Sequence, residues 1–250
     1  YDREALVIAS HAGVRTAGER RIDASRTHLL LELDATLRRL NVEYVDVWYV
    51  DRYDPLTPIN EVLLTMDIAV RSGRVRHVGV GNYSGWQLAE IAALASSGLP
   101  IIATCMEYSL VQRGIEREVL PAAQHFGTGV VAWSPLGRGV LTGKYRTGVP
   151  ADSRGASPLW GRFVQTHLSA HGRRVVEGVA TAASGLGLAP IDVALAWMRE
   201  RPGAVASVLG PRTVGQLRAA LAHVDLVLPT EIVQALDEVS EPERAYPDPV

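Results

Sequence analysis

Residues 44–82 read YVDVWYVDRYDPLTPINEVLLTMDIAVRSGRVRHVGVGN, and this stretch decides the fold. Val45–Val50 and Val75–Val80 are apolar runs rich in β-branched side chains, so both are expected to be strands. Between them, Thr57-Pro58 is typical of a helix start, because proline suits the first helical turn. Ser72-Gly73 is typical of a helix end. Strand, helix and strand in succession predict a βαβ unit with parallel strands.

The same alternation continues along the rest of the chain. Because the expected strands are almost continuously apolar, we expect both of their faces to be buried. The other expected strands are Leu6–Ser10, Pro100–Met106, Gly129–Trp133 and Ala204–Leu209. The other expected helices are one running from a Ser25 N-cap to Leu40, Gly85–Ser97 after a Ser84 cap, Ile115–Phe126, Val175–Leu186, Pro190–Glu200, Thr213–Ala222 and Pro229–Val239.

Repeated βαβ units predict an α/β fold of the TIM (β/α)8 barrel type, formed as a single domain over residues 1–250. Six strands are expected, so the two units needed to complete eight are expected before Tyr1. An open doubly wound sheet is the rival topology. It would need a glycine-rich phosphate turn after the first strand, and the residues Ser10–Val14, SHAGV, do not form one.

Composition excludes several classes of function. The chain has 250 residues, 47% of them hydrophobic, with a net charge of -2 and no basic run, which argues against nucleic acid or an anionic membrane as partner. The longest apolar runs have the length of strands, so no membrane span is expected. The N-terminal residues lack the pattern of a signal peptide, and the single cysteine, Cys105, fits a reducing cytoplasm. All 25 basic residues except Lys144 are arginine, so a mechanism that needs a lysine has one candidate in this chain.

Polar and aromatic side chains follow the ends of all six expected strands. In parallel barrels these ends lie on one face and carry the functional residues, so the sequence predicts a binding mouth there. No C-x-x-C spacing occurs, since the chain has a single cysteine, and no metal site is expected. The residues at the strand ends are His11; Asp51-Arg52; Asn82; Cys105-Met106-Glu107; Trp133-Ser134; and Gly210-Pro211-Arg212.

An ordered series of motifs around these residues resembles the aldo-keto reductase superfamily, in its bacterial NADP-dependent form. Each motif alone is of moderate specificity, but the series keeps the family's order and spacing over essentially the whole chain. The motifs are residues 37–49, LRRLNVEYVDVWY; 72–84, SGRVRHVGVGNYS; 107–110, EYSL; 132–145, AWSPLGRGVLTGKY; 194–198, ALAWM; and 210–217, GPRTVGQL.

The resemblance implies an eight-stranded barrel that binds NADP(H) and transfers a hydride to or from a carbonyl carbon. Trp133 offers a flat face for the nicotinamide, and Asn82 and Cys105 stand at positions that contact its carboxamide. The loop from Ser134 is expected near the diphosphate, with Arg138 supplying charge. The start of the last motif, with Arg212, is expected at the 2′-phosphate, which favours NADPH over NADH. The implied cofactor-binding residues are Asn82, Cys105, Trp133, Ser134, Pro135, Leu136, Gly137, Arg138, Leu141, Gly210, Arg212, Thr213 and Gln216.

The catalytic positions depart from the family's set of Asp, Tyr, Lys and His. The Asp and Tyr belong to the first two units of the barrel. The lysine's position holds His11, and the histidine's position holds Asp51. Smaller departures are Gly81 in place of a serine, Cys105 in place of a glutamine, and Ala220 where an asparagine often meets the adenine.

His11 and Asp51 are expected on adjacent strands at one level, close enough to form a pair. Two interpretations follow. The chain is an NADP(H)-dependent oxidoreductase for a small-molecule carbonyl or alcohol substrate, with His11 and Asp51 as a rewritten proton relay. Alternatively, it is an NADP(H)-binding barrel with little or no reductase activity, such as a sensor, a regulatory subunit or a pseudo-enzyme. The sequence leaves the substrate and the oligomeric state open, and the long connection Thr147–Gly172 is the candidate substrate loop.

Overall fold

A computed structural model describes residues 2–16, 20–95 and 98–243 of the chain. They form two compact units. Unit 1 comprises Tyr1–Met106 and Glu118–Val130, and unit 2 comprises Glu107–Arg117 and Val131–Val250. We describe each unit by itself, and a single domain over residues 1–250 stays a prediction.

The strands follow chain order, as the alternating pattern predicts. Their order from β1 to β6 has no reversal, whereas a doubly wound sheet changes direction at a switch point. The pairs β1/β2, β2/β3 and β3/β4 are parallel. The predicted α/β fold of TIM-barrel type is therefore confirmed for the described residues. The strands are β1 (Ala9–Ala12), β2 (Val45–Val50), β3 (Val75–Gly81), β4 (Ile101–Glu107), β5 (Gly129–Trp133) and β6 (Ala204–Val208).

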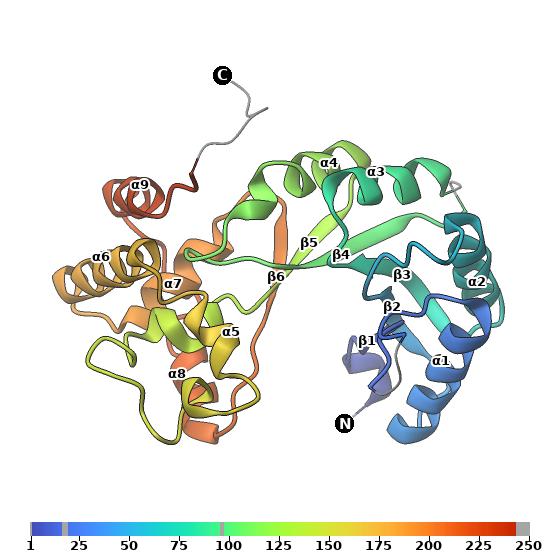
Figure 1. Cartoon of the computed structure of the whole chain (residues 1–250), viewed down its shortest axis with the longest axis horizontal. Coiled ribbons are helices and arrows are strands. Elements are labelled where there is room, and N and C mark those ends of the chain that lie inside the picture. Colours follow the sequence, from blue (N-terminus) through green and yellow to red (C-terminus); the bar gives the residue numbers. More distant parts are fainter. Residues whose placement is uncertain (1, 17–19, 96–97, 244–250) are drawn as a thin grey trace. The chain divides into compact units, whose positions relative to one another are not determined.

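In unit 1, helices cover one face of the strands (Figure 1). Side chains alternate along a strand, and Trp48, Val50, Val78 and Val80 are almost completely buried. Residues His11 and Asp51 have the opposite parity and keep part of their side chains exposed. The face that carries His11 and Asp51 is mixed, because the buried Tyr49 lies on it as well. The helices are α1 (Arg26–Leu40), α2 (Ile59–Arg71), α3 (Gly85–Leu94) and α4 (Val119–Phe126).

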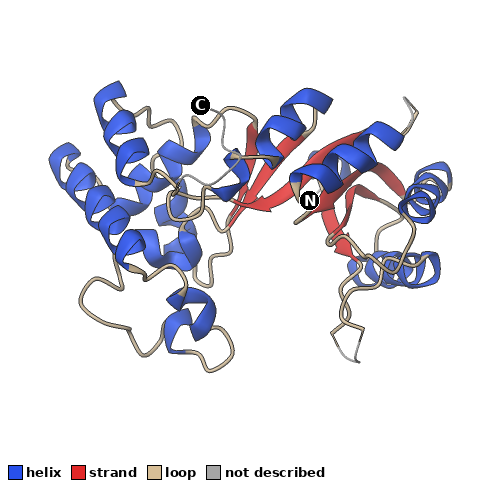
Figure 2. Ribbon diagram, turned by 45° about the horizontal axis from the view of Figure 1, so that its top comes forward, coloured by secondary structure: helices blue, strands red, loops and turns tan. Residues whose placement is uncertain are grey.

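Unit 2 consists mainly of helices and long loops (Figure 2). Its best-buried helix is α7, where Trp197 is fully buried and donates from Nε1 to Asp237 at 2.8 Å. β6 differs from the expectation of burial on both faces, since Val205 is 66% exposed. The helices are α5 (Gly161–Gln165), α6 (Ala170–Leu186), α7 (Pro190–Arg199), α8 (Val214–Leu221) and α9 (Thr230–Val239).

Short 3-10 segments complete the secondary structure. η1 precedes β1 in unit 1, and the others belong to unit 2. They are η1 (Arg3–Ala5), η2 (Gly114–Glu116), η3 (Gly137–Thr142) and η4 (Arg154–Ala156).

Several expected elements have other bounds in the structure. The largest differences are at β1, at α6, which begins at Ala170 instead of the expected Val175, and at the helices expected over Ile115–Phe126 and Gly85–Ser97. β1 lies closer to the C-terminus than the expected Leu6–Ser10, so His11 is inside the strand. The expected helix Ile115–Phe126 is η2 followed by α4. Pro121 falls in the first turn of α4, where a missing N–H costs nothing, whereas a helix begun at Ile115 would place it in the interior. The expected helix Gly85–Ser97 ends at Leu94, and residues 96–97 lie outside the described residues.

Within the described ranges, no single helix is long and apolar enough to span a membrane. α6 and α7 meet the length and composition only as a pair, and the pair is bent by 102° at its break.

Candidate functional site

His11 and Asp51 are brought together by the pairing of β1 with β2. His11 is the register partner of Tyr49, and the backbone N–H of Asp51 donates to Ala12 at 2.9 Å, which continues the ladder one residue past β2. The imidazole Nδ1 of His11 lies 2.9 Å from Asp51 Oδ1. The side chains are 41% and 23% exposed. The pair predicted from the sequence is therefore present, at a place that solvent reaches.

Asn82 holds the same carboxylate from the next strand. Its side-chain Nδ2 donates to the backbone oxygen of Asp51 at 3.2 Å and lies 3.4 Å from Asp51 Oδ1. Its backbone N–H donates to the carbonyl of Cys105 at 3.0 Å. Asn82 has a φ of 54°, a left-handed conformation that asparagine tolerates better than most residues. The amide predicted for cofactor binding is thus also part of the support for Asp51.

Gly81 makes room for Asp51. A Cβ at this position would lie 2.9 Å from Asp51 Oδ1 and 3.2 Å from both the Cα and the backbone oxygen of Asp51. A serine here, as in the family's pattern, would press on the carboxylate and on its backbone. The glycine at position 81 and the aspartate at position 51 therefore fit one another sterically.

Tyr49 is a residue of this site that ends the motif at residues 37–49 but is not among the site residues predicted from the sequence. Its ring stacks on His11, with centroids 4.7 Å apart and planes 15° from parallel. Burial, with a smaller effect from Cys105, raises the pKa of Tyr49 to about 12. Burial, with a smaller effect from Asp51, raises the pKa of the Cys105 thiol to about 11. Both groups are neutral at pH 7. The period-two alternation of β2, which places residues 49 and 51 on one face, was the signal that could have found Tyr49.

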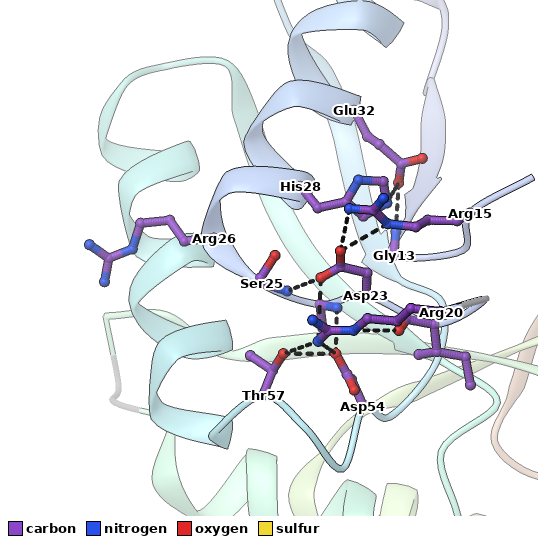
Figure 3. Close-up of polar contacts among 12 residues, drawn as sticks. Gly13, Arg15, Arg20, Asp23, Ser25, Arg26, His28, Glu32, Asp54 and Thr57 are labelled. Atoms are coloured by element: carbon purple, nitrogen blue, oxygen red, sulfur yellow. Dashed lines mark hydrogen bonds and ion pairs between the residues drawn. The ribbon is translucent and has the colours of Figure 1, made fainter. Parts of the chain in front are cut away.

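An ionic network of two buried carboxylates and two partly exposed arginines fixes the loops that follow β1 and β2 (Figure 3). Asp54 Oδ2 accepts hydrogen bonds from Arg20 at 2.7 Å, from Thr57 at 2.7 Å and from the backbone N–H of Ala24 at 2.8 Å. Asp23 accepts from Arg15 at 2.6 Å. The loop after His11 is thereby tied to the loop after Asp51.

The network depresses the pKa values of both carboxyls. Burial alone would raise the pKa of Asp23, but hydrogen bonds from Ser25 and Arg15 hold it at about 2. Burial would also raise the pKa of Asp54, but the hydrogen bonds that it accepts from Ala24, Thr57 and Arg20 lower this pKa below its usual value. Buried carboxylates with this many donors stay ionised and rigid, so they hold the loops beside His11 and Asp51 in one arrangement.

In unit 2, Arg138 is held by protein groups. Its Nη2 lies 2.9 Å from Glu107 Oε2, and its Nη1 donates to the carbonyl of Phe163 at 2.9 Å. Its Cζ lies 5.7 Å from the centroid of the Trp133 ring. Arg138 was expected to offer charge to a diphosphate, and the structure shows its charge paired with Glu107 beside that ring.

His167 adds a second contact to Glu107. Its Nε2 lies 3.2 Å from Glu107 Oε1, and the residue is 6% exposed. His167 comes from the connection after α5, inside the expected substrate loop Thr147–Gly172. The carboxylate at the end of β4 thus links this loop to the loop that carries Arg138.

The loop after Trp133 turns through left-handed residues. Ser134, Gly137 and Arg138 have φ values of 54°, 53° and 58°. The N–H of Gly137 donates to the carbonyl of Ser134 at 2.8 Å, which makes the loop compact. The remaining predicted residues lie in the same loop or close behind it: Pro135 and Leu141 are buried, and Leu136 is partly exposed.

The start of α8 brings together the other predicted residues. Thr213 is the N-cap, and its hydroxyl accepts from the Gln216 N–H at 3.2 Å. The Gln216 side chain accepts from the Arg212 N–H at 2.7 Å, and Arg212 Nη2 donates to the carbonyl of Asp152 at 2.9 Å. Gly210 precedes them, with open space where a Cβ would stand. Arg212, Thr213 and Gln216 are all exposed to solvent.

No group of three or more His, Cys, Asp or Glu side chains suited to a metal ion occurs among the described residues.

Comparison with known proteins assigns the family. The model of the Aldo/keto reductase family matches residues 1–241. The chain is 33% identical over 209 residues to the uncharacterized oxidoreductase YrpG of Bacillus subtilis (strain 168), a match that covers 83% of this chain and 62% of YrpG. The chain thus spans less than two thirds of the length of that relative.

Two further relatives carry a different name. A probable voltage-gated potassium channel subunit beta of Oryza sativa subsp. japonica is 33% identical over 229 residues, covering 88% of this chain and 70% of that protein. A putative subunit of the same name from Schizosaccharomyces pombe (strain 972 / ATCC 24843) is 30% identical over 249 residues, covering 96% and 72%. Because the family model matches residues 1–241 of the 250-residue chain, the chain belongs to the aldo/keto reductase family.

Proposed function

We propose that the protein is an NADP(H)-dependent oxidoreductase that interconverts a carbonyl compound and its alcohol, with His11 and Asp51 as its proton relay. The observation that carries the proposal is the 2.9 Å hydrogen bond between His11 Nδ1 and Asp51 Oδ1. A histidine that is oriented by a carboxylate is the arrangement enzymes use for general acid–base catalysis. The oxidoreductase name of the relative from Bacillus subtilis supports the same class of reaction.

The residues at the start of α8 fit the phosphate end of NADP(H). Arg212 supplies a guanidinium, Thr213 a hydroxyl, and the first turn of α8 its N–H groups and positive dipole. Guanidinium and helix N-terminus together are the donor set that binds a phosphate monoester, which favours NADPH over NADH. When bound, the cofactor supplies or accepts the hydride at the reacting carbon.

His11 and Asp51 transfer the proton that the reaction requires. Asp51 accepts the hydrogen bond at Nδ1, so Nε2 is the nitrogen of His11 that can exchange a proton with substrate. For reduction, Nε2 gives its proton to the carbonyl oxygen as the hydride reaches the carbon. For oxidation, Nε2 takes the hydroxyl proton. Asp51 stabilises the imidazolium form in both directions.

The second candidate is an NADP(H)-binding barrel with little or no reductase activity. The observation that favours it is the set of relatives named as potassium channel beta subunits. Under this reading the protein would act by binding a partner protein, and His11 and Asp51 would have no catalytic role. In either case we propose a cytoplasmic location, in keeping with the single buried cysteine.

One pair of measurements separates the two candidates. Fluorescence titration of the full-length protein with NADPH and NADH measures binding, and NADPH consumption with a panel of aldehydes and ketones measures turnover. The oxidoreductase predicts preferential NADPH binding and turnover with some carbonyls. Tight binding without turnover across the panel supports the second candidate, and absence of binding contradicts both.

A further inference from the structure

A buried tyrosine ring covers one face of the imidazole of His11. Tyr49 and His11 are register partners on β2 and β1, and their rings are nearly parallel with centroids 4.7 Å apart. Tyr49 is 3% exposed, whereas the His11 side chain is 41% exposed. The imidazole therefore contacts a packed ring while part of it remains open to solvent.

The Tyr49 ring is itself held in place by the next strand. Gly79 is the register partner of Tyr49 on β3, and a Cβ at Gly79 would lie 2.6 Å from Cε1 and 2.7 Å from Cδ1 of the tyrosine. Any larger residue there would displace the ring. Tyr49 is thus packed between the backbone of Gly79 and the imidazole of His11.

We propose that Tyr49 is a positioning residue that fixes the plane of His11 and so presents Nε2 for proton transfer. The inference rests on the proposed function. A single hydrogen bond from Nδ1 to Asp51 leaves the imidazole able to tilt about that bond. The stack on Tyr49 removes this freedom, because tilting would break the contact between the two ring faces. Hydrogen bond and stack together define one position for Nε2.

The ring of Tyr49, rather than its hydroxyl, performs this role. Tyr49→Phe keeps the ring and should behave as the wild type, whereas Tyr49→Leu removes it. Tyr53→Leu is the matched control, since Tyr53 is an aromatic residue four positions later whose ring contacts Tyr83 and Trp86. The three variants separate loss of the stack from loss of any nearby aromatic ring.

The first measurement is the NMR relaxation of the His11 ring in the full-length protein, with His11 assigned by His11→Gln. In the wild type, Tyr49→Phe and Tyr53→Leu, we expect a rigid ring with a high order parameter. In Tyr49→Leu the order parameter should fall, because the hydrogen bond to Asp51 alone lets the imidazole tilt. An unchanged order parameter in Tyr49→Leu overturns the proposal. If the leucine variant does not fold, Tyr49→Met, which fills the space with a flexible side chain, decides in the same way.

The second measurement is turnover with NADPH and a carbonyl substrate. A misplaced Nε2 should lower kcat by about tenfold in Tyr49→Leu and leave the KM for NADPH unchanged. A rise in the KM for NADPH with an unchanged kcat contradicts a positioning role. If the wild type shows no turnover, the proposed function fails, while the order parameter of the His11 ring still decides whether Tyr49 positions His11.

Discussion

Asp51 Oδ1 lies 2.9 Å from Nδ1 of His11, and the side-chain amide of Asn82 donates to the backbone oxygen of the same Asp51 at 3.2 Å. These residues come from β1 and from the ends of β2 and β3. Three adjacent strands therefore fix one imidazole–carboxylate pair. The pair has both the geometry and the access to solvent that a proton relay requires.

The first prediction concerns the charge of Asp51. Asp51→Asn keeps an oxygen that can accept from Nδ1 but removes the negative charge that stabilises the imidazolium. We expect kcat to fall by about 100-fold or more, with the Kd for NADPH unchanged. Asp67→Asn, which removes a carboxylate paired with Arg71 on the outer helix α2, is the control and should leave kcat unaltered. Equal turnover by Asp51→Asn and the wild type would exclude Asp51 from the relay.

The second prediction concerns Gly81. Gly81→Ser restores the residue of the family's pattern but places a Cβ 2.9 Å from Asp51 Oδ1. We expect the free energy of unfolding to fall by about 1–3 kcal/mol, as for overpacking of a buried site. Gly185→Ala, in α6 with open space around its Cβ, is the control and should raise stability by up to about 1 kcal/mol. Urea unfolding measures the free energy of unfolding of both variants. A Gly81→Ser variant as stable as the wild type would contradict the steric fit between positions 81 and 51.

The third prediction concerns pH and the loop network. The pKa of Asp23 is about 2 in the folded protein, below the value of about 3.9 for an unfolded chain. As the pH falls, the unfolded chain takes up the proton first. The stabilisation by ionised Asp23 is therefore complete above about pH 4 and is lost as the pH falls towards about 2.

Asp23→Asn tests this linkage. The variant should lose roughly 2 kcal/mol of stability at pH 7, and its difference from the wild type should shrink below about pH 4. Asp225→Asn, at an exposed position, should match the wild type at every pH. If the difference in unfolding free energy between Asp23→Asn and the wild type stays constant down to the pH of acid unfolding, the ionised Asp23 does not stabilise the fold in this way.

The fourth prediction concerns the nucleotide. Arg212→Ala should weaken NADPH binding by about 10- to 100-fold, the range of a charge-assisted hydrogen bond to phosphate, and should affect NADH much less. Arg218→Ala removes an exposed arginine from the same helix and serves as the control. Calorimetry measures all four affinities. Equal weakening by the two variants would point to a general charge effect instead of a 2′-phosphate site.

Much of the fold follows from the sequence because its signals are local. The apolar runs at Val45–Val50 and Gly129–Trp133 have the predicted bounds in the structure, and α1 ends at Leu40 as expected. The strand expected over Leu6–Ser10 begins too early, because the pairing of β1 with β2 starts only at Ala9. The apolar residues Leu6–Ile8 precede this pairing. Hydrophobicity alone does not define where a strand pairs.

The candidate site could be predicted only in part, because some of its contacts depend on how the strands pair. Motif order pointed to His11 and Asp51, and strand pairing brings them together. The ring of Tyr49 and the clearance at Gly79 depend on register between strands, which no single motif encodes. Arg138 pairs with Glu107, which lies 31 positions earlier in the chain. The motif that contains Arg138 does not include Glu107, so the motif alone does not predict that this charge is paired.

The central claim is that His11 moves the proton in a hydride-transfer reaction. The most direct test supplies NADPH deuterated at the transferable position, together with a carbonyl panel, to the full-length protein and to His11→Ala. The account predicts deuterium on the alcohol carbon with the wild type, and a rate at least about 100-fold lower with His11→Ala at equal NADPH binding. Equal rates of label transfer, or no label in any alcohol from a wild type that binds NADPH, would contradict it.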